Sequence, residues 1–199
     1  MWFRFIRVRS YMGRKSNALQ RRNQITWALF ECLATKGHEK VTIKEIAAQA
    51  NLPPGVIHYY FKSKDEIIST LAQAIVEKYT LKLEARLSEK NTTPKRIQSA
   101  VDFIVDELIF DATLNRVFYN LIQMAFERIE LRDVMKQMFQ EYRERLARFL
   151  TEVGVVSQDD SLGAAIVAMA EGFSLQLMVQ PDAISRKAVH RTIMQLLQS

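Results

Sequence analysis

Residues 52–67, LPPGVIHYYFKSKDEI, place a histidine and two tyrosines side by side: His58, Tyr59 and Tyr60. Pro54 precedes them closely, and the next break follows soon, so the helix that carries them has only about two turns. Imidazole nitrogens and tyrosine hydroxyls can hydrogen-bond to phosphate oxygens, while their flat rings can pack on a sugar or a thymine methyl. These residue types therefore suggest contact with DNA rather than catalysis.

Three short helices are expected to position these rings. The capping box of Thr42 and Glu45 starts one of them, and Asn51 tolerates the positive φ that a tight turn requires. Two helices joined by such a turn are typical of the helix-turn-helix, whose second helix lies in the DNA major groove. The apolar spacing predicts these helices at 19–36, 42–50 and 54–60.

The charge distribution also indicates a polyanionic partner. Residues 1–64 hold twelve Lys/Arg and three Asp/Glu, a net of +9, whereas residues 65–199 have a net of −3. A basic end on a mildly acidic body is the pattern of a protein that touches a polyanion with one end. A solvated basic surface is the alternative that charge alone leaves open.

Composition indicates an all-α protein, because glycine and proline are scarce and helix-forming residues dominate. A single cysteine, Cys32, allows no internal disulfide, and no metal-ligand spacing is visible, so we expect a cytoplasmic protein without a metal or cofactor. The first eleven residues mix aromatics with arginine but are too short to span a membrane, and no membrane partner is expected. The arm at 1–17 is expected to be basic and disordered.

The rest of the chain predicts six further helices, about nine in all. Together they give a helix-turn-helix domain at 18–64 and a helical ligand-binding and dimerisation domain at 65–199. The further helices are expected at 64–90, 94–110, 113–127, 131–153, 159–179 and 184–197.

The helix at 159–179 is apolar on nearly every side, so it must be covered on more than one face. A second subunit is the natural cover in a chain of this size, which predicts a homodimer; an ordinary core helix is the alternative. The expected interface residues are Ile166, Met169, Phe173, Val189, Ile193 and Leu196.

Aromatic and methionine side chains in the same part of the chain could line a pocket for an apolar or amphipathic ligand. Glu171 is the only charge in the apolar run and could meet a cationic ligand, pair across the dimer or lie at a rim. Ordinary core is the alternative for the others. The candidate ligand residues are Phe103, Phe118, Met124, Phe139, Tyr142, Met169, Glu171 and Phe173.

Residues 25–67 resemble the TetR family of transcriptional regulators. The resemblance is carried by Gly37, Thr42, Ile46–Ala47, Gly55, Tyr60–Phe61 and Ser63–Lys64 at the family's spacing. Asn51 stands where the family usually has glycine, His58 where it usually has tyrosine, and Pro54 where a small polar or basic residue is common.

The resemblance implies a role in DNA binding for nine residues. Thr42, Lys44 and Lys64 would contact phosphates, Pro54, Gly55 and Val56 would face base edges, and His58, Tyr59 and Tyr60 would hold the DNA backbone. Arg14, Lys15, Arg21 and Arg22 could form a basic arm along the duplex.

The resemblance also implies a homodimeric repressor that a small molecule releases from its operator through the fourth helix. One alternative is a helix-turn-helix activator or architectural DNA binder without a ligand. An enzyme is disfavoured because no phosphate loop, metal cluster or nucleophile motif is present. A bundle that only binds proteins is disfavoured by the charge asymmetry.

Overall fold

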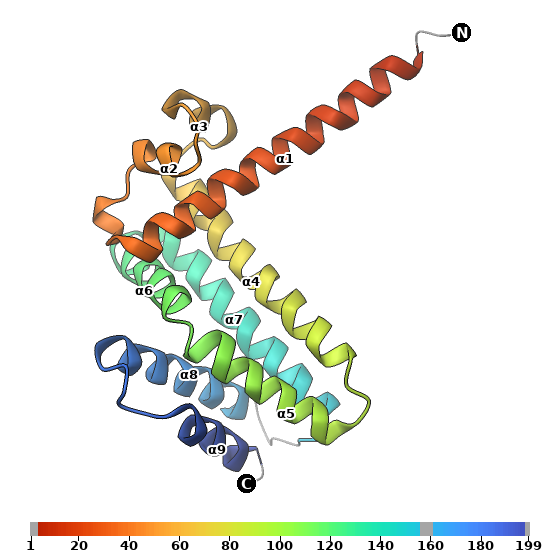
Figure 1. Ribbon diagram of the computed structural model, residues 1–199, viewed down its shortest axis with the longest axis vertical. Helices are drawn as coiled ribbons and strands as arrows, with labels where there is room; N and C mark the ends of the chain where they lie inside the picture. The colour runs from red at the N-terminus through yellow and green to blue at the C-terminus, as the bar shows by residue number, and fades with distance from the viewer. Residues whose placement is uncertain (1–3, 156–160, 198–199) are drawn as a thin grey trace. The chain divides into compact units, whose positions relative to one another are not determined.

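The computed structural model describes the backbone of residues 4–155 and 161–197, and the side chains of 17–155 and 161–197. Within these residues it has nine α-helices and no strand, which confirms the all-α prediction (Figure 1). The chain divides into two compact units after Leu71. The helices are α1 (Arg4–Thr35), α2 (Ile43–Gln49), α3 (Pro54–Tyr60), α4 (Lys64–Ser88), α5 (Thr93–Phe103), α6 (Ala112–Glu127), α7 (Ile129–Glu152), α8 (Ser161–Val179) and α9 (Arg186–Leu196).

The first unit contains the predicted helix-turn-helix. Thr42 Oγ1 accepts from the Glu45 amide and the Glu45 carboxylate accepts from the Thr42 amide, so the capping box starts α2 as expected. Asn51, with a φ of 54°, follows the end of α2. The Leu52 amide donates to the Ala47 carbonyl at 2.9 Å, which closes a Schellman turn. The tight turn that the sequence predicts between α2 and α3 is therefore present.

One detail of this unit differs from expectation. Helix α1 begins at Arg4, although 1–17 was expected to be a disordered arm; the run contains no proline that would stop a helix. After α1, Gly37 has a φ of −65°, an extended backbone that any residue adopts, and a 3-10 turn follows at His38–Lys40.

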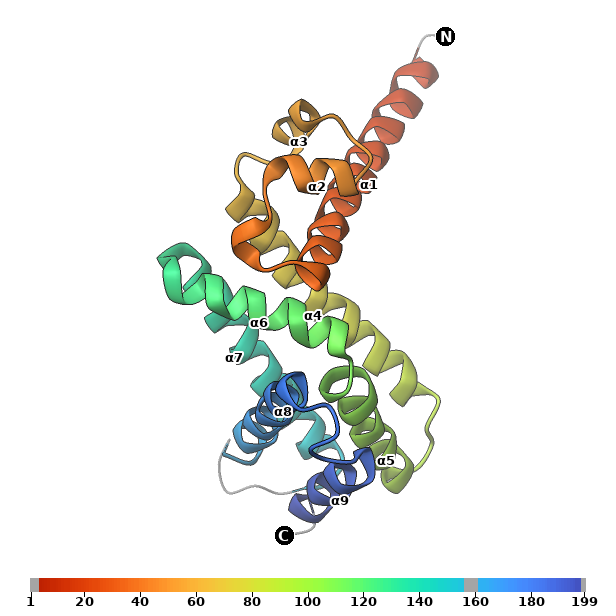
Figure 2. The same cartoon turned by 60° about the vertical axis from the view of Figure 1, so that its left-hand side comes forward.

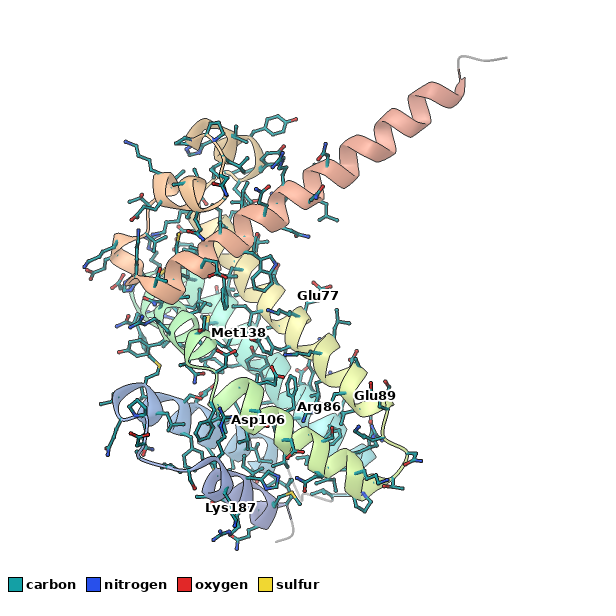
Figure 3. All side chains as sticks on the ribbon, in the orientation of Figure 1. Glu77, Arg86, Glu89, Asp106, Met138 and Lys187 are labelled. Carbon is teal, nitrogen blue, oxygen red and sulfur yellow. The ribbon has the colours of Figure 1, made fainter. Side chains whose placement is uncertain are left out.

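In the second unit, α5 and α9 lie side by side, and α8 packs against α7 and α6 (Figures 1 and 2). Charged side chains join the helices at the surface. Arg186 of α9 pairs with Asp106 at 2.7 Å. Arg86 of α4 reaches α5, where its Nε donates to Ser99 Oγ at 3.2 Å (Figure 3).

The predicted helix at 94–110 is two elements. Helix α5 ends at Phe103, and a π-helical segment, η2 (Ile104–Ile109), continues it. The Phe110 amide donates to the Val105 carbonyl at 3.0 Å, five residues back. The Asn115 side chain of α6 donates to the Ile109 carbonyl at 2.7 Å and satisfies the end of this segment. A π segment of this kind often marks a functional site.

Helix α8 is, among the described residues, the one helix long and apolar enough to cross a membrane by length and composition. Core helices of soluble proteins pass the same test, so one such helix is weak evidence for a membrane span. The first two residues of the helix expected at 159–179 lie outside the described residues. Gly163 lies close to α7, since a Cβ there would be 3.5 Å from the Arg143 carbonyl oxygen.

Candidate DNA-binding surface and ligand cavity

Helix α3 presents the polar side chains that the sequence singled out. His58 and Tyr59 are exposed, Tyr59 to 83%, and Tyr60 is half-buried with its ring 5.0 Å from that of Tyr59. Ile57 and Phe61 turn inward and are buried, as their spacing of four predicts. The helix thus has one face anchored in the unit and one face open to a partner.

The other candidate residues lie around this face. Pro54 and Gly55 are exposed at the start of α3, and Val56 is half-buried. Lys44 is exposed on α2. Thr42 is also exposed, although its hydroxyl already accepts the capping hydrogen bond from Glu45.

Lys64 has an intramolecular contact in addition to its expected role. Its Nζ lies 3.4 Å from the His38 carbonyl oxygen, and its side chain is half-buried. Ser63 Oγ accepts from the Glu66 amide at 3.1 Å, while the Glu66 carboxylate accepts from the Lys62 amide at 2.7 Å. These bonds fix the start of α4 beside the end of α3.

Arg22 joins α1 to the end of α3, a role that the sequence reasoning missed. One guanidinium nitrogen donates to the Tyr60 carbonyl and the other lies 3.0 Å from Glu66 Oε1. Its guanidinium carbon lies 4.0 Å from the centre of the Phe61 ring. Arg22 therefore belongs to the packing that positions α3, not to an arm reaching outward.

The remaining arm residues give less information. Arg21 donates to Gln24 Oε1 at 2.7 Å on the same helix. The side chains of Arg14 and Lys15 lie outside the described residues. The Glu66 carboxylate accepts hydrogen bonds from the Lys62 amide and from Arg22, and these bonds, the first more than the second, lower the pKa of its carboxyl group.

The second unit contains a cavity of about 580 Å³. Its walls come from α4, α5, η2, α6, α7 and α8, and most of the side chains are aliphatic or aromatic. A volume of this size suits a small-molecule ligand. Of the eight ligand candidates, five line the cavity: Phe103, Phe118, Phe139, Tyr142 and Glu171.

Three candidates do not line it. Met124 is buried in the core, at 2% exposure. Met169 and Phe173 pack against the cluster that joins η2, α8 and α9. The sequence reasoning missed wall residues of α4 and of the segment after α5, because it treated α4 as a connecting lever and 94–110 as one ordinary helix; these include Ile75, Tyr79, Leu83, Ile104 and Leu108.

Polar groups in the cavity are few and strongly affected by burial. Burial raises the pKa of Tyr79 to about 12 and raises the pKa of Tyr142 as well, with a further contribution from the negative charge of Glu171. Burial also raises the pKa of Glu171 to about 7, against a smaller opposing effect of Arg143. A carboxyl group in such an apolar wall lacks the water that would stabilise its charge.

Three of the six expected dimer residues lie inside the chain. Val189 and Ile193 are 0% exposed in the core cluster, and Ile166 is 2% exposed. A side chain with no exposed surface cannot touch a partner directly, so we expect no direct dimer contact from these three. Leu196, Met169 and Phe173 are half-buried. The apolar residues of α8 that are exposed follow a different stripe: Ala165, Ala168, Leu175 and Val179.

Comparison with known proteins agrees with this architecture. Residues 25–71 match the model for bacterial regulatory proteins of the tetR family, and residues 95–199 match the tetracyclin repressor-like C-terminal domain. The chain is 22% identical to the HTH-type transcriptional regulator PksA of Bacillus subtilis, over 90% of this chain and 89% of that protein. It is 29% identical to the nucleoid occlusion factor SlmA of Vibrio atlanticus, over 85% of this chain and 87% of that protein.

Among solved structures, the fold resembles the transcriptional regulator FadR from Bacillus subtilis in complex with stearoyl-CoA. The TM-score is 0.73 at 23% identity, over 88% of this chain and 97% of that chain. The family models cover both units of the chain, and they confirm the expectation of a DNA-binding regulator rather than an enzyme. The chain therefore belongs to the TetR family of bacterial transcriptional regulators.

Proposed function

We propose that this protein is a cytoplasmic, homodimeric repressor that a small apolar or amphipathic molecule releases from its operator. The observation that carries the proposal is the cavity of about 580 Å³ in the unit that follows the helix-turn-helix. Helix α4 lines this cavity with Ile75, Tyr79 and Leu83, and its first turn is bonded to the end of α3 through Glu66. One continuous helix thus carries residues of the cavity and residues that position α3.

The reading surface in this proposal is the exposed face of α3 with the start of α2. His58, Tyr59 and Tyr60 hold the DNA backbone, and Lys44 and Lys64 contact phosphates. Pro54, Gly55 and Val56 approach base edges, where the missing side chain of Gly55 leaves room. Because the contacts are mostly to phosphates, we expect affinity to fall steeply with salt.

The dimer surface in this proposal is the exposed stripe of α8. Ala165, Ala168, Leu175 and Val179 are separated by three, seven and four residues, so they share one helix face. Leu175 is 50% exposed and Val179 is 84% exposed. A second copy of the chain packed on this stripe would cover apolar surface that the single chain leaves in water.

The ligand must bind the DNA-free state more tightly than the DNA-bound state, because a ligand with equal affinity for both shifts nothing. A cavity walled by α4 can meet that condition if filling it moves α4. A nucleoid-type DNA binder that needs no ligand is the second candidate, supported by the similarity to SlmA.

Fluorescence anisotropy tests the proposal. The protein is titrated onto a duplex from upstream of its own gene and onto a scrambled duplex, at several salt concentrations. We expect saturable, salt-sensitive binding to the first duplex only, which small amphipathic molecules reverse. Equal weak binding to both duplexes contradicts a specific repressor; specific binding that no cavity ligand alters favours the ligand-free candidate.

A further inference from the structure

The cavity walls hold one carboxyl group, Glu171 of α8. In the described part of the chain, no hydrogen bond or ion pair reaches its carboxylate. Arg143, which is exposed on α7, attracts it only weakly compared with the cost of burial. A buried carboxylate is stable only when a positive charge or hydrogen-bond donors compensate for lost water. The chain itself leaves that position open to a ligand.

The walls around Glu171 suit a positive charge. Six aromatic side chains other than Tyr142 and Tyr79 line the same cavity: Phe103, Phe118, Tyr119, Phe126, Phe139 and Phe149. The negative face of an aromatic ring attracts an organic cation, most strongly when water is excluded. The remaining walls are largely aliphatic and can receive an apolar body.

A second hollow, of about 300 Å³, adjoins the cavity and is lined by α4 and α7. The two share Val76, Thr80 and Arg145. Three carboxylates line this groove: Glu77, Glu84 and Glu141, of which Glu77 is labelled in Figure 3. The Arg145 guanidinium lies 3.6 Å from the Glu141 carboxylate, so its charge is already partly compensated.

The groove thus has a net negative charge, with three carboxylates against the guanidinium of Arg145, and the cavity beside it holds Glu171 and the shared Arg145. A groove lined by one sign of charge concentrates ligands of the opposite sign and repels the others. A fatty acid carboxylate would pass Glu77, Glu84 and the Glu141–Arg145 pair and then face the carboxyl group of Glu171. An organic cation would be attracted along the same route.

We propose that the cavity binds an amphipathic organic cation, an amine or quaternary ammonium on an apolar body. Its charge lies against Glu171, and it reaches the cavity past Glu77, Glu84 and Glu141. The assignment rests on the proposed effector function of this cavity and names the chemical class of that effector.

Three probes that share a decyl chain test the proposal: decyltrimethylammonium, decanoate and decan-1-ol. Isothermal titration calorimetry measures their binding to the full-length protein without DNA. We expect decyltrimethylammonium to bind at least about 10-fold more tightly than either of the others, the scale of one compensated buried charge. Tightest binding of decanoate or decan-1-ol, or no binding of any probe, overturns the proposal.

Glu171→Gln removes the charge and keeps the shape of the side chain. We expect it to lose most of the preference for decyltrimethylammonium while its affinity for decan-1-ol stays within about 3-fold, a change of less than about 1 kcal/mol. Glu144→Gln is the matched control, because Glu144 is an exposed residue of α7 outside the cavity. An unchanged preference in Glu171→Gln contradicts the role of this carboxylate. The ranking of probes in the unmodified protein needs no variant and decides the ligand class even if Glu171→Gln folds poorly.

Adding decyltrimethylammonium to the protein–DNA complex separates this inference from the proposed function. Tight binding in calorimetry without release of DNA supports the cation site and contradicts the repressor mechanism. Release of DNA by decanoate but not by decyltrimethylammonium supports the repressor mechanism and contradicts the cation site.

Discussion

Replacing Arg22 with methionine tests how α3 is held in place. Methionine keeps an apolar stem of similar length but removes the ion pair with Glu66, the bond to the Tyr60 carbonyl and the contact with the Phe61 ring. The half-exposed ion pair contributes about 0.5 kcal/mol, the hydrogen bond about 1 kcal/mol and the ring contact about 0.5 kcal/mol. We therefore expect the free energy of unfolding of the first unit to fall by about 2 kcal/mol.

Urea denaturation followed by tryptophan fluorescence measures this change. Both tryptophans, Trp2 and Trp27, precede α2 in the chain, so the signal reports on the first unit. Arg21→Met is the matched control, since Arg21 donates only to the neighbouring Gln24 among the hydrogen bonds described. Equal stability of the two variants would refute the positioning role of Arg22.

Four further substitutions test the DNA-binding surface, the start of α4, the dimer surface and the core. Tyr59→Ala should weaken binding to the operator by about 1–3 kcal/mol in anisotropy titrations without lowering the thermal midpoint, because Tyr59 is 83% exposed; unchanged affinity would remove Tyr59 from the reading surface. Glu66→Gln should destabilise the first unit at neutral pH; in urea titrations the difference from the unmodified protein should begin to shrink as pH falls below the ordinary pKa of 4.5 and should vanish once pH is below the lowered pKa of folded Glu66. A difference that persists unchanged in acid would argue against the carboxylate. Leu175→Glu should yield monomers in light scattering, whereas Ile129→Glu, at a 61% exposed position on α7, should not; a persistent dimer in the first variant would place the interface elsewhere. Ile193→Ala should lower the free energy of unfolding by about 2–4 kcal/mol because Ile193 is 0% exposed, and unchanged stability of the variant would contradict its place in the core.

The first unit was predictable because its signals are local. A capping box, an asparagine with positive φ and a proline at the start of α3 each fix a boundary within a few residues of the chain. The inward turn of Ile57 and Phe61 follows from helical spacing alone. Arg22 was misassigned because its partners, Tyr60 and Glu66, are about forty residues away, and a charge pattern cannot show such a contact.

The helices of the second unit could be predicted from the sequence, but which face of each helix is buried, lines the cavity or is exposed could not. Helix α8 is apolar all round, so its periodicity does not distinguish the wall of a cavity, the core and an exposed stripe. Ile166 and Met169 each lie one residue beyond the exposed Ala165 and Ala168, and one residue rotates a helix face by about 100°. The π segment η2 contains no proline or glycine that would indicate it in the sequence, and it contributes Ile104 and Leu108 to the cavity.

Site-specific photo-crosslinking tests the central claim, that α3 reads DNA, most directly. Benzoylphenylalanine replaces Tyr59 in one protein and Leu81, an exposed residue of α4, in another, and each is irradiated with the upstream duplex. We predict a DNA adduct from position 59 that excess scrambled duplex does not abolish, and none from position 81. Equal adducts from both positions, or an adduct from position 81 alone, would contradict it.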